Sequence, residues 1–228
     1  MLSCENLVKK YMTVTAVSDI SVDIEAGKIY ALLGPNGSGK TTFMKMVAGL
    51  TKPTSGNILM EGEPLATRHK AEIAYMPTEG YFYSFMNCND VGKYYQDFFP
   101  DFSMERYNEL MEKMQLSHKD KVSKMSSGMM AKLKIAVTLA RDAKIIMLDE
   151  PLNGIDIIAR ENIINTIICS ATDNRAIIVS SHLVDELEKI IDYAVFIKEG
   201  AVVKQGNAEE LRELTGKSIV DIYKDIYA

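Results

Sequence analysis

A chain of 228 residues is long enough for one domain, or for one domain with a small insertion. Its 47% hydrophobic and 25% charged residues are ordinary globular values, and a net charge of −5 argues mildly against nucleic acid as the main partner. No apolar run approaches the length of a membrane span and the first residues do not resemble a signal peptide, so we expect a cytoplasmic protein whose three cysteines are free thiols.

The first part of the chain reads as short strands around one helix. Residues 2–8 and 17–24 alternate apolar and polar side chains, which predicts two antiparallel strands. The apolar run at 28–33 predicts a buried strand, and the apolar spacing of 42–48 suits a helix after it. Two further strands are predicted at 57–60 and 73–76.

Residues 78–142 differ from the preceding part because helical patterns replace strand patterns. Apolar side chains recur three and four positions apart over 90–99 and 104–116, and 128–141 consists of good helix formers. We therefore expect a helical lobe inserted into an α/β core. Its many methionines are expected to fill gaps in the apolar core, with a methionine-rich partner-binding face as the alternative.

Strands and helices alternate again after residue 143. The apolar runs 145–148 and 176–179 predict buried strands, followed by helical patterns at 156–170 and 183–191. A hairpin over 193–203 and helices over 208–214 and 219–227 complete the chain. This alternation predicts an α/β fold with a mostly parallel sheet, whose functional residues lie beyond the carboxyl ends of the strands.

The segment Gly34-Pro35-Asn36-Gly37-Ser38-Gly39-Lys40-Thr41 matches the phosphate-binding loop G-x-x-x-x-G-K-[ST], between a predicted strand and a predicted helix. Glycines let backbone N–H groups close around phosphate oxygens, and the helix start adds a positive dipole end. Lys40 is expected to reach the β- and γ-phosphates, and the Thr41 hydroxyl to ligate Mg²⁺. The sequence therefore predicts a site for a nucleoside triphosphate.

Two carboxylates follow the predicted strand at 145–148. Asp149 stands where such ATPases hold Mg²⁺ through its water shell, and Glu150 can polarise a water molecule for attack on the γ-phosphate. Two acids after an apolar strand are a weak signal on their own. Together with the loop at Gly34, they predict hydrolysis of the bound triphosphate.

The order and spacing of these motifs resemble the ATP-binding subunit of ABC transporters over nearly the whole chain. The matching segments are the phosphate loop, a signature-like Lys124-Met125-Ser126-Ser127-Gly128-Met129, Leu148-Asp149-Glu150-Pro151-Leu152-Asn153-Gly154-Ile155-Asp156, and Ser181-His182. The resemblance implies a phosphate-loop ATPase core with an N-terminal antiparallel β subdomain and an inserted α-helical lobe. In a single domain over 1–228, residues 1–77 and 143–206 then form the core, 78–142 the lobe, and 207–228 the C-terminal helices.

The resemblance also implies roles for individual residues. Tyr11 matches the aromatic residue that stacks on adenine, and Glu150 and His182 match the catalytic carboxylate and the histidine that contacts the γ-phosphate. Mg²⁺ is expected at Thr41 and Asp149. The residues that cradle the ATP phosphates are expected to be Gly34, Pro35, Asn36, Gly37, Ser38, Gly39, Lys40, Thr41 and Thr42. The remaining histidines, His69 and His118, are expected at the surface.

The signature-like segment implies that one chain is not enough. The start of the predicted helix 128–141 presents free N–H groups and a positive dipole end, which suit a γ-phosphate. In ABC ATPases this end faces ATP bound on the other subunit, so Ser126 and Gly128 are expected to bind ATP in trans in a head-to-tail dimer. Two-fold pairing suits a homodimer, although a paired homologue is equally allowed.

Two departures from the family pattern concern hydrolysis. The family's Leu-Ser-Gly-Gly-Gln is Met125-Ser126-Ser127-Gly128-Met129 here, so that Ser127 adds a Cβ and Met129 removes an amide. The family's glutamine after the strand at 73–76 is replaced by Thr78-Glu79, of which either the hydroxyl or the carboxylate can serve Mg²⁺ or water. We expect normal ATP binding and modest turnover without the membrane partner.

These features predict an ATP-hydrolysing subunit that powers a separate membrane permease by ATP-driven dimerisation, in the manner of short bacterial exporters. It is expected at the inner face of the cell membrane, held there by the permease. The aromatic run 81–85 either docks that permease or packs the lobe against the core. The alternative is a degenerate or regulatory nucleotide-binding subunit of a heterodimer with weak hydrolysis, against which the retained Glu150 and His182 argue.

Overall fold

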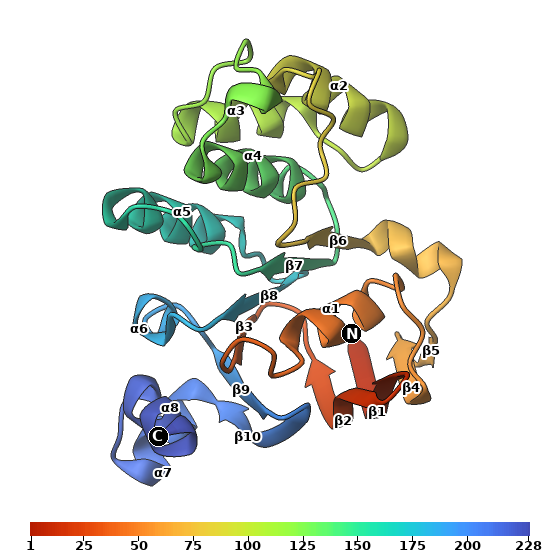
Figure 1. The fold of residues 1–228 in the computed structure, drawn as a ribbon, viewed down its shortest axis with the longest axis vertical. Helices are drawn as coiled ribbons and strands as arrows, with labels where there is room; N and C mark the ends of the chain where they lie inside the picture. Colours follow the sequence, from red (N-terminus) through yellow and green to blue (C-terminus); the bar gives the residue numbers. More distant parts are fainter.

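The strands form a single ten-stranded sheet, in which the order of neighbouring strands is β5-β4-β1-β2-β10-β9-β3-β8-β7-β6 (Figure 1). The computed structural model describes residues 1–228. Its strands are β1 Leu2–Tyr11, β2 Val14–Ile24, β3 Ile29–Leu33, β4 Ser55–Met60, β5 Glu63–Pro64, β6 Ile73–Met76, β7 Ile145–Asp149, β8 Ala176–Ser181, β9 Tyr193–Lys198 and β10 Ala201–Asn207. Strands β9, β3, β8, β7 and β6 are parallel neighbours, whereas β1 pairs antiparallel with β2 and β4. The predicted mixed α/β fold with an antiparallel N-terminal part is confirmed.

Helices flank this sheet and build a separate lobe above it in Figure 1. The helices are α1 Lys40–Val47, α2 Cys88–Phe98, α3 Met104–Lys113, α4 Ser127–Leu139, α5 Ile157–Ser170, α6 Val184–Leu187, α7 Ala208–Thr215 and α8 Ile219–Tyr227, with short 3₁₀ turns η1 Thr67–Glu72 and η2 Val122–Lys124. The predicted helix over 183–191 is wrong beyond Leu187, where the Ile190 N–H bonds to the Leu187 carbonyl and closes a tighter turn.

The central strands are buried on both faces, which is why they read as continuous apolar runs. On β3, Tyr30 and Leu32 join one apolar core with α1, while Ala31 and Leu33 join a second core with α4, α5 and α8. A parallel sheet covered on both faces produces this pattern. Its carboxyl edge therefore collects the loops that follow β3, β7 and β8.

The helical lobe is built from α2, α3 and α4, and side-chain caps define where its helices begin. Asn87, Ser103 and Ser126 each accept a hydrogen bond from the backbone N–H three residues ahead. Met111 and Met114 are fully buried, and the lobe's other methionines that the sequence singled out are half-buried against the same core: Met104, Met125, Met129 and Met130. Core filling is therefore their role in this fold.

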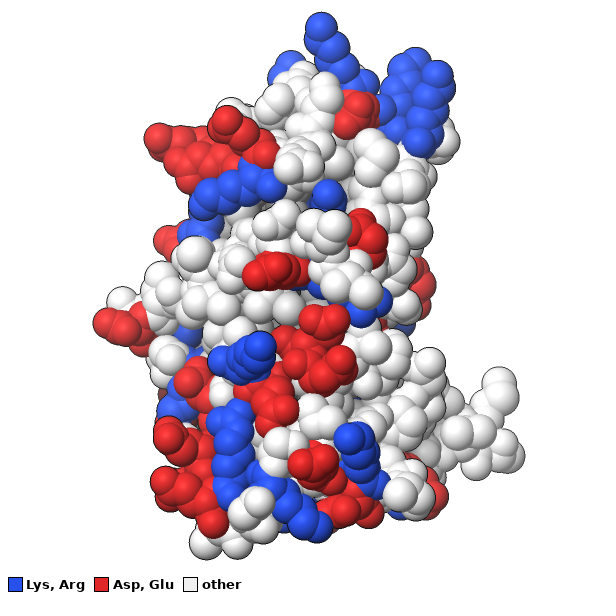
Figure 2. Space-filling model, turned by 90° about the vertical axis from the view of Figure 1, so that its left-hand side faces the viewer, with Lys and Arg blue, Asp and Glu red and all other residues white.

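The surface mixes charges of both signs. Figure 2 shows acidic and basic side chains interspersed over the face that it displays. His118 is exposed as predicted, but the prediction for His69 is wrong: its side chain is 7% exposed, and its Nδ1 accepts a hydrogen bond from the Ala66 N–H. No helix of the structure has both the length and the apolar character needed to span a membrane.

Candidate functional site

The phosphate loop connects the end of β3 to the start of α1, and two of its glycines are required by close contacts. A Cβ on Gly34 would lie 2.4 Å from the Ile197 carbonyl oxygen, and one on Gly39 would lie 2.7 Å from the Ala16 carbonyl oxygen. Gly39 also has φ 110°, a left-handed conformation that favours glycine. The loop is thus packed against its own chain and pre-shaped before α1 begins.

Lys40 is the first residue of α1, and its side chain is only 5% exposed. Its Nζ donates hydrogen bonds to the carbonyls of Gly34 at 2.7 Å and Pro35 at 3.1 Å, and lies 3.3 Å from Glu150 Oε1. A buried ammonium requires such partners because desolvation is expensive. The lysine therefore places a positive charge inside the loop, where the sequence motif predicts phosphate.

Asp149 ends β7 and is completely buried. Its Oδ1 accepts a hydrogen bond from the Ser180 hydroxyl at 2.6 Å, and its Oδ2 accepts one from the Tyr75 hydroxyl at 3.2 Å. Burial and the neighbouring Asp149 charge raise the pKa of Tyr75 far above its ordinary value, so Tyr75 remains a donor. Both carboxylate oxygens are thus held in fixed orientations.

Glu150 adopts a strained backbone conformation at the edge of the same sheet. Its φ is 49°, which is uncommon for a residue with a side chain, and its N–H donates to the Ser180 hydroxyl at 2.9 Å. Its Oε1 faces Lys40, and its Oε2 lies 2.9 Å from Nδ1 of His182, which directly follows β8. The predicted catalytic pair is therefore in direct contact.

A cavity of about 300 Å³ lies beside the phosphate loop, whose residues form much of its wall. It is lined by Ala16, Asn36, Gly37, Ser38, Gly39, Lys40, Thr41, Thr42, Thr78, Glu150 and Asn153. Thr78 lies in this lining, whereas Glu79 points to Lys45, whose Nζ is 3.2 Å from Glu79 Oε1. A backbone N–H and this lysine hold the pKa of the Glu79 carboxyl below its ordinary value. Of the two alternatives for the missing glutamine, only Thr78 borders the cavity.

The donors near this cavity suit a magnesium ion that is also bound by phosphates. The structure contains no cluster of three or more acidic, histidine or cysteine side chains able to hold a metal by itself. Thr41 lines the cavity, and Asp149 lies buried at the carboxyl end of β7. A hydroxyl and a carboxylate are hard oxygen donors, and Mg²⁺ is commonly bound by one or two protein ligands plus substrate phosphates.

Six predicted ATP contacts are absent from the lining of this cavity: Gly34, Pro35, His182, Tyr11, Ser126 and Gly128. Tyr11 ends β1 with a ring that is 45% exposed and 5.0 Å from Nζ of Lys9. Ser126 is exposed and caps α4, its hydroxyl accepting the Met129 N–H at 3.2 Å. Gly128 lies in the first turn of α4, and no atom comes closer than 3.8 Å to the position that a Cβ would occupy there. The start of α4 therefore touches the Gly154 carbonyl but leaves room for a Cβ at Gly128.

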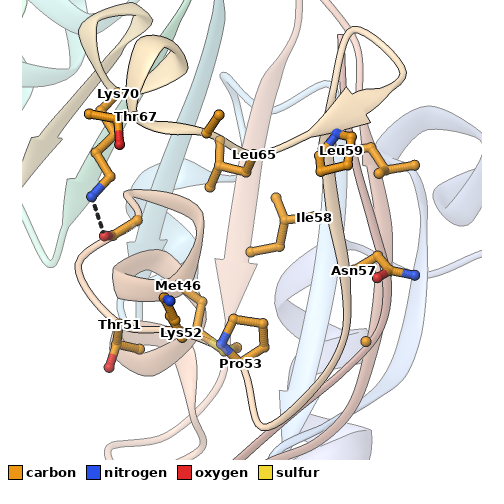
Figure 3. A pocket seen from close by; sticks show the side chains of 14 residues that line it. Met46, Thr51, Lys52, Pro53, Asn57, Ile58, Leu59, Leu65, Thr67 and Lys70 are labelled. Carbon is orange, nitrogen blue, oxygen red and sulfur yellow. Dashed lines mark hydrogen bonds between the residues drawn. The ribbon is translucent and has the colours of Figure 1, made fainter.

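A second cavity, of about 430 Å³, lies at the opposite end of α1 (Figure 3). Met46, Ile58 and Leu65 line it, and Lys70 donates to the Gly49 carbonyl there at 2.8 Å. Its lining has no carboxylate that could activate a water molecule or hold a metal ion. It also lies near the carboxyl end of the helix, where the dipole disfavours anions. The phosphate loop is therefore the better site for a triphosphate.

Sequence patterns did not identify several residues that position this site. Ser180 stands opposite Asp149 in the parallel register of β7 and β8, and Tyr75 reaches Asp149 from β6. Lys134, on α4, donates to the carbonyls of Pro77 and Thr78. Only the order of strands could have pointed to Ser180, and no local motif marks Tyr75 or Lys134.

Comparisons with known proteins agree with this geometry. Residues 17–153 match the family model described as ABC transporter. The lantibiotic transport ATP-binding protein SrtF of Streptococcus pyogenes is 34% identical over 225 residues, 96% of this chain and 98% of that protein. The lipopolysaccharide export system ATP-binding protein LptB of Haemophilus influenzae is 32% identical over 222 residues, 92% of each. The dimeric structure of a post-hydrolysis state of the ATP-binding cassette MJ0796, bound to ADP and Pi, has a TM-score of 0.81 at 20% identity, over 91% of this chain and 98% of that one. The chain belongs to the ABC transporter family, as one of its ATP-hydrolysing subunits.

Proposed function

We propose that two copies of this chain pair head to tail around two ATP molecules, and that hydrolysis in this dimer drives export through a separate membrane permease. Within each site, Glu150 is the general base for the attacking water, and His182 contacts the γ-phosphate. Tyr11 stacks on adenine with its exposed ring, and the residues from Gly34 to Thr42 hold the phosphates.

The observation that supports this most strongly is the position of Glu150. Its carboxylate lies between the Lys40 ammonium, at 3.3 Å, and the His182 ring, at 2.9 Å, on the border of the phosphate cavity. A carboxylate so placed can accept a proton from a water molecule beside the γ-phosphate. Binding of ATP then draws Lys40 toward the phosphates and leaves Glu150 available for that water.

Magnesium belongs to the same proposal. The Thr41 hydroxyl would hold the ion, Asp149 would hold it through water, and Thr78 would supply a further hydroxyl in place of the family's glutamine. The fixed orientation of the Asp149 carboxylate, bonded by Ser180 and Tyr75, supports this assignment. The ion neutralises charge on the β- and γ-phosphates when bound.

The exposed start of α4 supports pairing with a second subunit. Its free N–H groups and dipole suit a phosphate, yet they lie outside the cavity of their own chain. The related cassette MJ0796 is described as a dimer with ADP and Pi. We propose that Ser126 and Gly128 contact ATP held by the partner, a second copy or a close homologue.

Export and membrane attachment rest on the relatives and on an aromatic groove. SrtF and LptB are named for lantibiotic transport and lipopolysaccharide export. A cavity of about 280 Å³ is lined only by apolar and aromatic residues from 81 to 99. Tyr83, which lines it, is 55% exposed, and the neighbouring Phe85 is 77% exposed. Such a groove suits a permease helix that holds the subunit at the inner membrane face. Co-purification with the permease tests this assignment.

A regulatory subunit with weak hydrolysis is the second candidate. The specific observation in its favour is the altered signature, in which Ser127 and Met129 replace a glycine and a glutamine of the family pattern. Contact between Glu150 and His182 argues for catalysis. Wild-type turnover separates the two candidates.

The experiment compares ATP hydrolysis by the wild type with hydrolysis by Glu150→Gln, measured as phosphate release. Because the amide cannot accept the proton, we expect a loss of about a hundredfold or more. ATP should still bind, so that light scattering shows an ATP-dependent dimer of the variant.

Glu161→Gln is the matched control, since Glu161 is an exposed glutamate on α5. It should hydrolyse ATP at the wild-type rate. Equal rates for Glu150→Gln and the wild type would remove Glu150 from the mechanism, and a monomer at saturating ATP would contradict the proposed pairing.

A further inference from the structure

Lys134 is a lysine in the middle of α4 whose side chain is only 6% exposed. Lysine is among the side chains least often buried, because its ammonium loses hydration that only good partners replace. No carboxylate lies within salt-bridge distance of its Nζ in the structure. Other groups must therefore replace the lost hydration of this ammonium.

The partners of Lys134 are two consecutive backbone carbonyls of the segment after β6. Its Nζ donates to the Pro77 oxygen at 2.9 Å and to the Thr78 oxygen at 2.8 Å. Burial lowers the pKa of Lys134, and the charges of Glu79 and Asp149 oppose this shift, which places the ammonium in their field. One side chain thus ties α4 to the turn that follows β6.

Thr78 is the residue through which these hydrogen bonds of Lys134 bear on the reaction. It lines the phosphate cavity, in the position where the family pattern has a glutamine. Its backbone has left the β6 strand, which ends at Met76, so no sheet hydrogen bond fixes it. The two bonds from Lys134 are the side-chain contacts that hold the Pro77 and Thr78 carbonyls in place.

The same helix reaches the other proposed nucleotide contact. Ser126 caps α4, and Lys134 lies about two helical turns, roughly 12 Å, further along this helix. A helix of this length moves as a rigid rod, and α4 lies against β6 and β7 (Figure 1). A shift of the exposed end of α4 would therefore reach the Pro77 and Thr78 carbonyls through Lys134.

We propose that Lys134 is a positioning residue for ATP hydrolysis, which fixes Thr78 at the phosphate cavity and couples it to the end of α4 that meets the partner's nucleotide. The proposal rests on the proposed function and assigns to this lysine the link between the two nucleotide sites of the dimer. Engagement of α4 by the partner's ATP sets the Thr78 hydroxyl in its working position.

The test measures kcat, ATP affinity and thermal stability for Lys134→Met, which keeps length and apolar stem but cannot donate. We expect kcat to fall about tenfold or more, since small misplacements of a positioning group reduce rates strongly, while ATP affinity of the monomer changes less than about twofold. Lys134→Arg retains charge and donors and should recover most of the rate. The matched control is Lys132→Met, on the same helix, whose side chain makes no hydrogen bond or ion pair; its rate should equal that of the wild type.

A double variant distinguishes positioning from general destabilisation. If Lys134 acts through Thr78, then Lys134→Met should add little to the loss already caused by Thr78→Ala, because coupled residues are not additive. Losses that multiply, or an unchanged kcat in Lys134→Met, would overturn the proposal. If Lys134→Met does not fold, Lys134→Gln replaces it: a neutral donor should give an intermediate kcat, and a kcat equal to that of the wild type overturns the proposal.

These outcomes remain distinct from a failure of the proposed function. A wild-type chain that neither dimerises with ATP nor releases phosphate refutes the function and the inference together. A wild-type chain that does both, with Lys134→Met equally active, refutes the inference alone.

Discussion

The phosphate loop and the start of α4 are the two regions proposed to offer backbone N–H groups to phosphate, but they differ in how their glycines are surrounded. At Gly34, a Cβ would lie 2.4 Å from a backbone oxygen of β9 and 2.7 Å from the Ser38 hydroxyl. At Gly128, no atom lies within 3.8 Å of the same position. The first region is tightly enclosed by its own chain, whereas the second has room for a side chain. The proposed nucleotide site, divided between two molecules, would explain this difference.

The comparison of Gly34 with Gly128 predicts that Gly34→Ala has the largest effect on stability and ATP affinity. The Ile197 oxygen belongs to a central sheet and cannot move away, so the free energy of unfolding should fall by about 2 kcal/mol or more. ATP affinity should fall with it, because the loop must shift. Chemical denaturation and titration with a fluorescent ATP analogue measure the two effects.

Gly80→Ala is the control for this variant. Gly80 has no positive φ, and nothing lies within 4 Å of the position that its Cβ would take. Its replacement should leave both quantities near their wild-type values. If Gly34→Ala behaves in the same way, the loop is less tightly packed than the structure indicates.

The prediction for Gly128→Ala is an intermediate effect, confined to the dimer. Alanine is a better helix former than glycine, so the free energy of unfolding should stay the same or rise by up to about 1 kcal/mol. A methyl group facing the partner's phosphate should nevertheless lower turnover about tenfold or more, a change of about 1.4 kcal/mol in the barrier. Phosphate release and ATP-dependent dimerisation measure this, together with ATP affinity at low protein concentration, which should not change. Undiminished turnover would mean that this end of α4 does not meet a nucleotide.

Features set by a local motif could be predicted from the sequence, whereas features set by distant contacts could not. The strand, loop and helix around Gly34 could be predicted because one short motif fixes their order, and the apolar runs of β3, β7 and β8 mark strands buried on both faces. Boundaries were less predictable where distant contacts decide them. Helix α6 stops at Leu187, and the Glu188 side chain instead accepts a hydrogen bond from the Ile219 N–H at the start of α8.

Residues that support the site through long-range contacts escaped the sequence patterns. Lys134 and the Thr78 carbonyl that it contacts are far apart in the chain, as are Tyr75 and Asp149. Neither pair forms a local pattern, because only the packing of α4 on the sheet and the order of the parallel strands bring them together. Motifs identify the groups that meet the ligand, and the fold identifies the groups that hold them.

Tyr227, on α8, provides the smallest predicted effect and tests how far the internal packing of the phosphate loop extends. Its hydroxyl lies 2.8 Å from the Ile197 oxygen, the atom that excludes a side chain at Gly34, and 3.1 Å from the Leu33 oxygen at the entry to the loop. Tyr227→Phe should lower the free energy of unfolding by about 1 kcal/mol, because the carbonyls of the buried residues Ile197 and Leu33 lose this donor. Denaturant unfolding measures this, and turnover should change less than about twofold.

Tyr223→Phe is the matched control for that variant, and it decides what α8 contributes. The Tyr223 ring lies 4.4 Å from the Tyr227 ring on the same helix, tilted by 45°, but its hydroxyl makes no hydrogen bond to the protein. Removing that hydroxyl should therefore leave the free energy of unfolding nearly unchanged. Equal losses in the two variants would show that the effect does not come from the hydrogen bond of Tyr227. A loss in Tyr227→Phe alone would place the support in one hydrogen bond, made to the backbone on which the phosphate loop rests.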